Sequence, residues 1–319
     1  MQSLTYAPDG KKLLVTIGDQ GLIWDIKQIT VTKTITDVSY TDVFGVVGVH
    51  WSPDGQTILV DNADGMVKVL DANTLGVIHT MSGFVSTYCP DNATILTTVD
   101  DDKLGGRVWS RETGKQIGLL DGRKVNNRSP YSIFCSPDSR HFLTTSGSLS
   151  SGVFRMALYE QGKDQPVAVI SDTQQMSLGG ITPDGKNVLT YDMVERNNAV
   201  RIWDIVAQRI VVSINIPSQV LNATLSPDGK LIATASGNES VRIWDRITGT
   251  LRLTLPGHIG PILSLAFSPD GRRLATAGFG DGVVRQYILP IDELLALAHQ
   301  RVTRQLSPVE RTQFLGENR

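Results

Sequence analysis

The side chains best suited to chemistry are few and lie far apart along the chain. The five histidines are scattered singly: His50, His79, His141, His258 and His299. The sequence has no Gly-x-Ser-x-Gly elbow, no phosphate-binding P-loop and no His-Glu-x-x-His pair. We therefore expect no catalytic residue, no metal and no cofactor, and we do not expect the chain to be an enzyme.

Two cysteines and one acidic run complete the reactive groups. Cys89 and Cys135 follow no metal or disulfide spacing pattern, so the sequence predicts two buried, inert thiols. A reducing, cytoplasmic setting is the corresponding expectation. The run Asp100-Asp101-Asp102 lacks spaced partner ligands for a cation and is interpreted as a solvated turn.

Charge and hydropathy argue against two classes of partner, nucleic acid and membrane. The 319 residues carry 30 Lys and Arg against 32 Asp and Glu, a formal net charge of −2. This balance does not favour nucleic-acid binding through bulk charge. No run of 18 apolar residues is present, and Met1–Leu4 lacks the basic and apolar blocks of a signal peptide. We expect neither nucleic acid nor a membrane as a partner.

These scattered groups must be positioned by an element that recurs along the chain. A small residue followed by Pro-Asp, and usually by Gly, occurs seven times. The prolines are Pro8, Pro53, Pro90, Pro137, Pro183, Pro227 and Pro269, spaced 45, 37, 47, 46, 44 and 42 residues apart. Pro fixes φ and Gly tolerates a positive φ, so each copy predicts a tight turn. The chain is therefore built from seven structural repeats.

Each repeat predicts four short antiparallel strands. An alternating stretch such as 262–267 precedes the turn, and an apolar strand follows it. Five repeats place a threonine seven residues after the proline: Thr97, Thr144, Thr190, Thr234 and Thr276. A third strand such as 241–245 and a fourth such as 251–255 complete the unit.

These repeats resemble the WD40-repeat family. The third strand ends in Trp24-Asp25, Trp203-Asp204 and Trp244-Asp245, with Trp109-Ser110 and Leu70-Asp71 as variants. The resemblance implies an all-β fold, a seven-bladed β-propeller over residues 1–289, with a short helical tail over 290–319. Blades are expected to start near residues 2, 46, 83, 130, 176, 220 and 262.

The chain departs from the family pattern in two repeats. The Gly-His pair that opens many such repeats occurs once, at Gly257-His258. In the family this histidine joins a buried set with a turn Asp and the strand Trp. Here Asp281 can supply the acid, but Tyr287 stands in place of Trp, so we expect an incomplete set. The fourth repeat, with its third strand at 153–159, is the most degenerate.

The seventh repeat lacks a predicted fourth strand. Helical spacing begins after Pro290, and Ser307-Pro308-Val309-Glu310 predicts a second short helix to about Leu315. Either the last blade has three strands with its edge covered by the tail, or an upstream segment of a longer polypeptide supplies the strand. The tail resembles the ends of bacterial multidomain signalling proteins.

The family resemblance also implies where a partner binds. In the family, contacts often fall at the start of the innermost strand, six residues before the proline. These positions form the predicted protein-binding top face: Gln2, Val47, Phe84, Tyr131, Ser177, Leu221 and Leu263. Phe84 and Tyr131 fall on adjacent blades, and neighbouring aromatic side chains are typical interface anchors.

The predicted function is a non-enzymatic protein–protein interaction module. The favoured context is the sensor, recognition or autoinhibitory domain of a larger bacterial signalling protein, with an effector domain upstream in the same polypeptide. The alternatives are a standalone scaffold that bridges two proteins and, in a different class, a propeller enzyme. The seven top-face positions hold no histidine or carboxylate, which argues against the enzyme.

Overall fold

The computed structural model describes most of the chain, and the account below concerns those residues. They are residues 3–36, 48–62, 64–99, 104–121, 132–147, 154–172, 176–192, 198–279 and 281–301. Within these ranges the chain is nearly all strand, with one short helix near the C-terminal end.

The Pro-Asp turn folds for local reasons. In the second repeat, the Ser52 hydroxyl lies 2.6 Å from a carboxylate oxygen of Asp54 and accepts the backbone N–H of Thr57 at 2.9 Å. Gly55 has a φ of 70°, in the left-handed region where a side chain would be strained. This hydrogen-bonded turn reverses the chain between the first and second strand of the repeat.

The first four repeats each form a four-stranded antiparallel sheet, called a blade. Blade 1 contains β1 (Leu4–Tyr6), β2 (Lys12–Ile17), β3 (Gln20–Asp25) and β4 (Thr30–Ile35). Blade 2 contains β5 (Val49–Trp51), β6 (Thr57–Asp61), β7 (Met66–Asp71) and β8 (Val77–Ser82). Blade 3 contains β9 (Ser86–Tyr88), β10 (Thr94–Thr97), β11 (Leu104–Ser110) and β12 (Gln116–Asp121). Blade 4 contains β13 (Ser132–Cys135), β14 (His141–Gly147), β15 (Phe154–Glu160) and β16 (Ala168–Asp172).

The last three repeats continue the pattern with one exception. Blade 5 contains β17 (Met176–Ile181), β18 (Asn187–Asp192), β19 (Ala199–Asp204) and β20 (Arg209–Asn215). Blade 6 contains β21 (Val220–Leu225), β22 (Leu231–Ser236), β23 (Val241–Asp245) and β24 (Leu251–Leu255). Blade 7 has three strands among the described residues: β25 (Ile262–Phe267), β26 (Arg273–Gly278) and β27 (Val284–Ile288).

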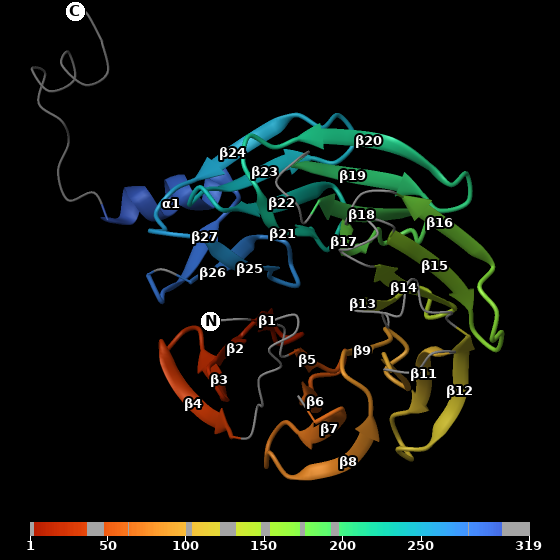
Figure 1. Cartoon of the computed structure of the whole chain (residues 1–319). Helices are drawn as coiled ribbons and strands as arrows, with labels where there is room; N and C mark the ends of the chain where they lie inside the picture. The colour runs from red at the N-terminus through yellow and green to blue at the C-terminus, as the bar shows by residue number, and fades with distance from the viewer. Residues whose placement is uncertain are drawn as a thin grey trace, which may run out of the picture.

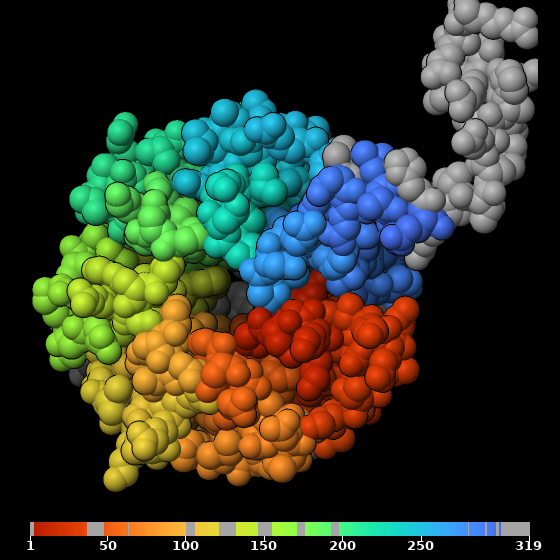
Figure 2. All heavy atoms as spheres, turned by 180° about the vertical axis from the view of Figure 1, so that it is seen from behind, coloured from red at the N-terminus to blue at the C-terminus, as the bar shows by residue number. Residues whose placement is uncertain are grey.

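The blades follow one another around a ring in chain order, and the first blade meets the last (Figure 1, Figure 2). A separate apolar cluster fills each junction between neighbouring blades. At the closing junction, Leu4 and Tyr6 of blade 1 pack against Ala275 and Ala277 of blade 7. The Gln286 side-chain amide also donates to the Tyr6 hydroxyl at 2.8 Å. The predicted seven-bladed propeller is therefore confirmed.

The three-stranded last blade is followed by α1 (Ile291–Arg301). Asp292 and Glu293 lie in its first turn, where acidic side chains stabilise a helix. Glu293 forms ion pairs with Arg272 and Arg273 of blade 7, and the helix contacts β27. The first tail helix is thus as predicted, while the second one predicted near Leu315 lies outside the described residues.

The prediction of two inert thiols is wrong. Cys89 and Cys135 form a disulfide, with their Cα atoms 5.2 Å apart and 46 residues between them in sequence. That separation is one repeat length, so the two cysteines end the innermost strands of adjacent blades, β9 and β13, which contact each other. The bond removes the premise for a cytoplasmic setting, because disulfides persist mainly in oxidising compartments.

No helix among the described residues is long and apolar enough to span a membrane.

Candidate functional site

The top face is the end of the ring at which the innermost strands begin. It is formed by the connections between blades and by the turns between the second and third strands of each blade, such as 237–240. The opposite face carries the seven Pro-Asp turns and the turns between third and fourth strands. Loops held on a rigid ring of this kind are suited to recognition.

The seven positions predicted for the top face have different outcomes. Gln2, Val47 and Tyr131 lie outside the described residues. Ser177, Leu221 and Leu263 are half-buried, and Phe84 is 39% exposed. The predicted aromatic pair of Phe84 and Tyr131 therefore stays a prediction.

Phe84 is held in place by its neighbours in blades 2 and 3. It lies in the connection between β8 and β9, and its backbone N–H donates to the Thr98 carbonyl at 3.1 Å. Its ring packs over the turn between β6 and β7, where a Cβ on Gly65 would come within 3.1 Å of the ring. Gly65 also has a φ of 78°, so this turn specifically favours glycine.

Leu221 and Leu263 occupy the same place in adjacent blades. The strand register shifts at both residues, so each is the extra residue of a β-bulge near the start of its inner strand. Bulges change the direction of a side chain relative to a regular strand. The Asn222 amide donates to the backbone carbonyl of Leu263 at 3.1 Å and ties the two bulges together.

A buried polar network supports the top of blade 7. His258 contacts Asp281 through Nδ1 at 2.9 Å and the Thr276 hydroxyl through Nε2 at 2.6 Å. Arg285 donates to the same Asp281 carboxylate at 2.9 Å. Tyr287 lies at the register position that a tryptophan occupies in other blades, opposite Leu274, and its hydroxyl donates to the Pro256 carbonyl at 2.9 Å. The expected partial set is therefore present.

The network presents exposed apolar side chains on the loops above it. Ile259 is 73% exposed, Phe279 66% and Val283 40%. The backbone N–H groups of Ile259 and Val283 both donate to Asp281, and that of Phe279 donates to the Pro261 carbonyl. These bonds hold the two loops side by side, and the three exposed side chains on them are here called the blade 7 patch.

Sequence reasoning missed the blade 7 patch because it considered only the starts of the innermost strands. The patch lies on loops, at Ile259, one residue after His258, and on either side of Asp281. The Gly257-His258 pair was the available signal, since it marks the repeat whose loops are fixed by a buried network.

No three His, Cys, Asp or Glu side chains within the described residues gather in a way that could hold a metal. Asp61 is buried, and burial raises its pKa to about 7 against the opposing hydrogen bonds from Ser86. Its carboxylate accepts the backbone N–H of Ser86 at 3.1 Å and also contacts the Ser86 hydroxyl, so it joins blade 2 to blade 3.

Comparisons with known proteins agree with this geometry. The family model for "WD domain, G-beta repeat" matches residues 213–245 and 249–287, which include most of blades 6 and 7. The COMPASS component SWD3 of Saccharomyces cerevisiae is 35% identical over 284 residues, covering 81% of this chain and 86% of the yeast protein.

Two further similarities are more distant. The WD repeat-containing protein 26 homolog of Arabidopsis thaliana is 23% identical over 297 residues, and the match covers 88% of this chain. The match spans about half of that plant protein's length, 47%. A chain of Kuenenia stuttgartiensis hydrazine synthase shares the fold with a TM-score of 0.76 at 17% identity, covering 91% of this chain and 96% of that one.

The seven repeated sheets, the Trp-Asp strand ends and the yeast relative matched over nearly its whole length point to the same family. This chain belongs to the WD40-repeat family.

Proposed function

We propose that this chain is a non-enzymatic protein-interaction module that binds a partner through its top face. The observation that carries the proposal is the blade 7 patch, in which the backbones of exposed Ile259 and Val283 are held by Asp281 and that of Phe279 by the Pro261 carbonyl. Apolar side chains held in one conformation lose little entropy when a partner covers them, which favours their use as anchors.

The binding surface extends from blade 7 toward the centre of the ring and around to blade 3. Leu263 and Leu221, on the tied bulges of blades 7 and 6, continue the patch inward. Phe84 with Tyr131 forms a second anchor region, and Val47, Ser177 and Gln2 complete the proposed ring of contacts. A rigid scaffold with several such positions suits a protein partner better than a small molecule.

The relatives support binding over catalysis. The yeast relative is named as a component of COMPASS, so a propeller matched over most of its length works within an assembly. The likeness to a hydrazine synthase chain is a likeness of fold at 17% identity and carries no chemistry to this chain.

We further propose that the propeller serves as the recognition or autoinhibitory domain of a larger signalling polypeptide. The match spans 47% of the length of the Arabidopsis relative, so propellers like this one also occur as parts of longer proteins. A bacterial affiliation rests on the tail sequence alone, since the relatives named above are eukaryotic.

Affinity capture from the source cells with matched variants tests the proposal. The first variant, Ile259→Ala with Phe279→Ala, removes the blade 7 patch. The second, Phe84→Ala with Tyr131→Ala, removes the other anchor region. The control, Val206→Ala with Ile247→Ala, removes two exposed apolar side chains, 88% and 71% exposed, from turns on the opposite face.

If the proposal is right, the wild-type chain and the control variant capture the same set of proteins. Loss of two anchors is expected to weaken binding by more than 2 kcal/mol, so the blade 7 variant should fail to capture this set. Capture that survives both top-face variants while folding is intact, or that is lost only in the control, would refute the proposal.

A further inference from the structure

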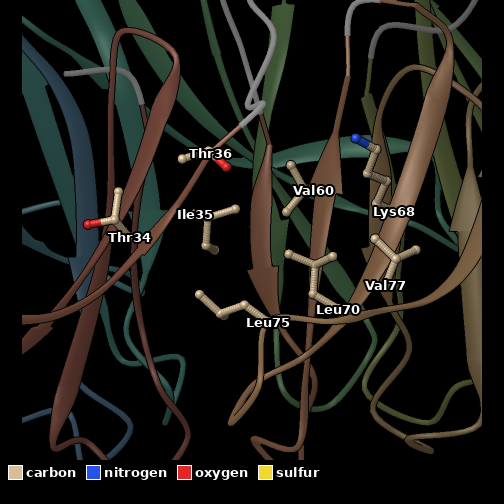
Figure 3. Close-up of a pocket in the computed structure, with 8 residues that line it drawn as sticks. All are labelled: Thr34, Ile35, Thr36, Val60, Lys68, Leu70, Leu75 and Val77. Atoms are coloured by element: carbon tan, nitrogen blue, oxygen red, sulfur yellow. The ribbon is translucent and has the colours of Figure 1, made fainter.

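A pocket of about 190 Å³ opens between blades 1 and 2, away from the blade 7 patch. Figure 3 shows it between the end of β4 and the sheet of blade 2. Its walls are one lysine, two threonines and five aliphatic side chains: Lys68, Thr34, Thr36, Ile35, Val60, Leu70, Leu75 and Val77. We call it the blade 1–2 pocket.

The pocket exists because blade 2 lacks a tryptophan–threonine pair. In blades 3, 5 and 6 a tryptophan Nε1–H donates to a threonine hydroxyl on the neighbouring strand, at 2.9 to 3.0 Å. In blade 6 these residues are Trp244 and Thr234. The strand register places Leu70 and Val60 at the equivalent positions of blade 2. A leucine is smaller than an indole, so space remains between the blades.

The same register position carries a basic residue in several blades. It is arginine in blades 3, 5, 6 and 7 and lysine in blade 2: Arg107, Arg201, Arg242, Arg285 and Lys68. Three of these cations have partners inside the ring. Arg107 donates to the Ser82 hydroxyl, Arg201 forms a buried ion pair with Asp192, and Arg285 pairs with Asp281.

Lys68 and Arg242 differ from these three, because no hydrogen bond or ion pair is formed by either side chain in the structure as described. Lys68 is only half-buried, and the blade 1–2 pocket lies beside it. Lys33, on β4 nearby, is not comparable, since its ammonium group donates to the carbonyls of Ala72 and Asn73. Within the described ranges Lys68 thus has no counter-charge, and it lies next to an apolar hollow.

The pocket has a polar end and an apolar end. In Figure 3 the Lys68 nitrogen and the Thr36 oxygen lie toward one end, and the side chains of Leu75, Leu70 and Val77 lie toward the other. Val60 and Leu70 are almost fully buried, so the apolar end is walled by side chains that also belong to the hydrophobic core. A ligand that matches both ends needs an aliphatic group joined closely to an anion.

We propose that the blade 1–2 pocket binds a short peptide segment of a partner protein, in which an aliphatic side chain is followed closely by an aspartate or glutamate. The aliphatic side chain packs against Ile35, Leu70 and Leu75. The carboxylate pairs with Lys68 and accepts a hydrogen bond from the Thr36 hydroxyl. At about 190 Å³ the pocket is small compared with the roughly 300 Å³ or more of drug-sized sites, which suits a single anchoring side chain.

This site is separate from the top-face anchors of blades 6 and 7. The variants that test the two proposals share no residue, so either can fail while the other stands. Filling the blade 1–2 pocket leaves the blade 7 patch intact, and removing the patch leaves the pocket open.

The test uses an array of capped, fluorescent heptapeptides in a Gly-Ser background. Each carries one Leu, Ile, Val or Phe, followed at the next or second position by Asp, Glu, Asn or Gln. Binding to the full chain is measured by fluorescence anisotropy. We expect aliphatic–acidic peptides to bind and their amide counterparts to bind about tenfold more weakly, since charge-assisted hydrogen bonds are lost. Equal binding of acids and amides, or no binding by any peptide, overturns the proposal.

Four variants locate the site on the protein. Leu70→Trp with Val60→Thr installs the arrangement of blades 3, 5 and 6 and should abolish binding while the chain stays folded, as checked by thermal unfolding. Lys68→Gln should weaken binding about tenfold and Lys68→Arg should preserve it. Arg242→Gln is the matched control, because Arg242 is the second cation at this register position without a partner among the described residues. It should leave peptide binding unchanged.

Two further results would also overturn the proposal. One is full peptide binding by the filled variant, which would place the peptides elsewhere. The other is competition by free 4-methylpentanoate as strong as that of the best peptide, which would make the pocket a site for small carboxylic acids.

Discussion

Blades 2 and 7 both lack the tryptophan–threonine pair of blades 3, 5 and 6, and they replace it in opposite ways. Blade 7 has Tyr287 at the tryptophan position and keeps Thr276, and it adds His258, which bonds Thr276 and the Asp281 carboxylate. Blade 2 has Leu70 at the tryptophan position and keeps an open pocket beside Lys68. The polar replacement fixes exposed loops, whereas the smaller replacement leaves room for a ligand.

One carboxyl group in each blade also differs in its pKa: Asp281 of blade 7 is partly exposed, and Asp61 of blade 2 is buried. Burial acts against ionisation of Asp281, but the N–H groups of Val283 and Ile259, together with His258, hold its pKa below the usual value. Asp61 of blade 2 has hydrogen bonds from Ser86 and no ion pair among the described residues, and burial raises its pKa to about 7. The two repeats therefore differ in how they accommodate a carboxyl group near the space between blades.

The largest expected effect comes from giving blade 6 the arrangement of blade 2. Trp244→Leu with Thr234→Val removes a buried indole and should reduce the free energy of unfolding by about 3 kcal/mol, because a cavity remains between blades 5 and 6. Urea unfolding followed by circular dichroism measures the change. A loss below about 1 kcal/mol would mean that the indole does not support this junction and that the comparison with blade 2 fails.

Removal of the histidine from blade 7 should have the next largest effect. His258→Ala deletes both hydrogen bonds of a fully buried side chain and should cost about 2 kcal/mol of unfolding free energy. The matched control is His141→Ala, whose exposed side chain pairs with Asp138 at the surface and should change stability by less than about 0.5 kcal/mol. Similar losses in both variants would argue against a special role for the His258 network.

The Asp61 carboxyl group gives blade 2 a distinct pH dependence. Burial raises the pKa of Asp61 from its ordinary 3.8 to about 7, so between these pH values the folded state binds the proton and the unfolded state has lost it. The free energy of unfolding should therefore fall as the pH rises from 4 to 7. Asp61→Asn should remove this fall. The difference in unfolding free energy between the variant and the wild type should therefore be about 1–2 kcal/mol more favourable to the variant at pH 8 than at pH 4.

Denaturant unfolding of both proteins at pH 4, 6 and 8 measures this difference. Parallel pH profiles for the wild type and Asp61→Asn would show that Asp61 ionises normally and would remove the contrast with Asp281.

The smallest effect is expected from filling the blade 1–2 pocket. Leu70→Trp with Val60→Thr should leave the unfolding free energy unchanged or raise it by up to about 1 kcal/mol, as cavity-filling substitutions do. Calorimetry measures the shift in Tm. Destabilisation by more than about 2 kcal/mol would show that the space does not accept an indole as the other blades do.

The sequence was sufficient to predict the propeller because the signal recurs. The Pro-Asp turn and the strands around it appear seven times, and each turn is made by local bonds such as those of Ser52 and Asp54. The sequence also predicted that the last repeat has no fourth strand of its own and that a helix follows Pro290, because the regular pattern stops there. It left open whether an upstream segment supplies that strand.

Contacts between blades were much harder to predict. The Cys89–Cys135 disulfide was missed, although a separation of one repeat is the signal that equivalent positions of adjacent blades meet. The unpaired state of Lys68 and the hollow beside Leu70 depend on what the next blade supplies. Exposed loop residues such as Phe279 carry no periodic signal at all.

Footprinting of the chain with a captured partner tests the central claim most directly. Hydroxyl-radical labelling read by mass spectrometry reports side-chain exposure with and without the partner. The account predicts protection of Ile259, Phe279 and Val283, with unchanged labelling of Val206 and Ile247 on the opposite face. Protection confined to the opposite face, with the blade 7 patch labelled as in the free chain, would contradict it.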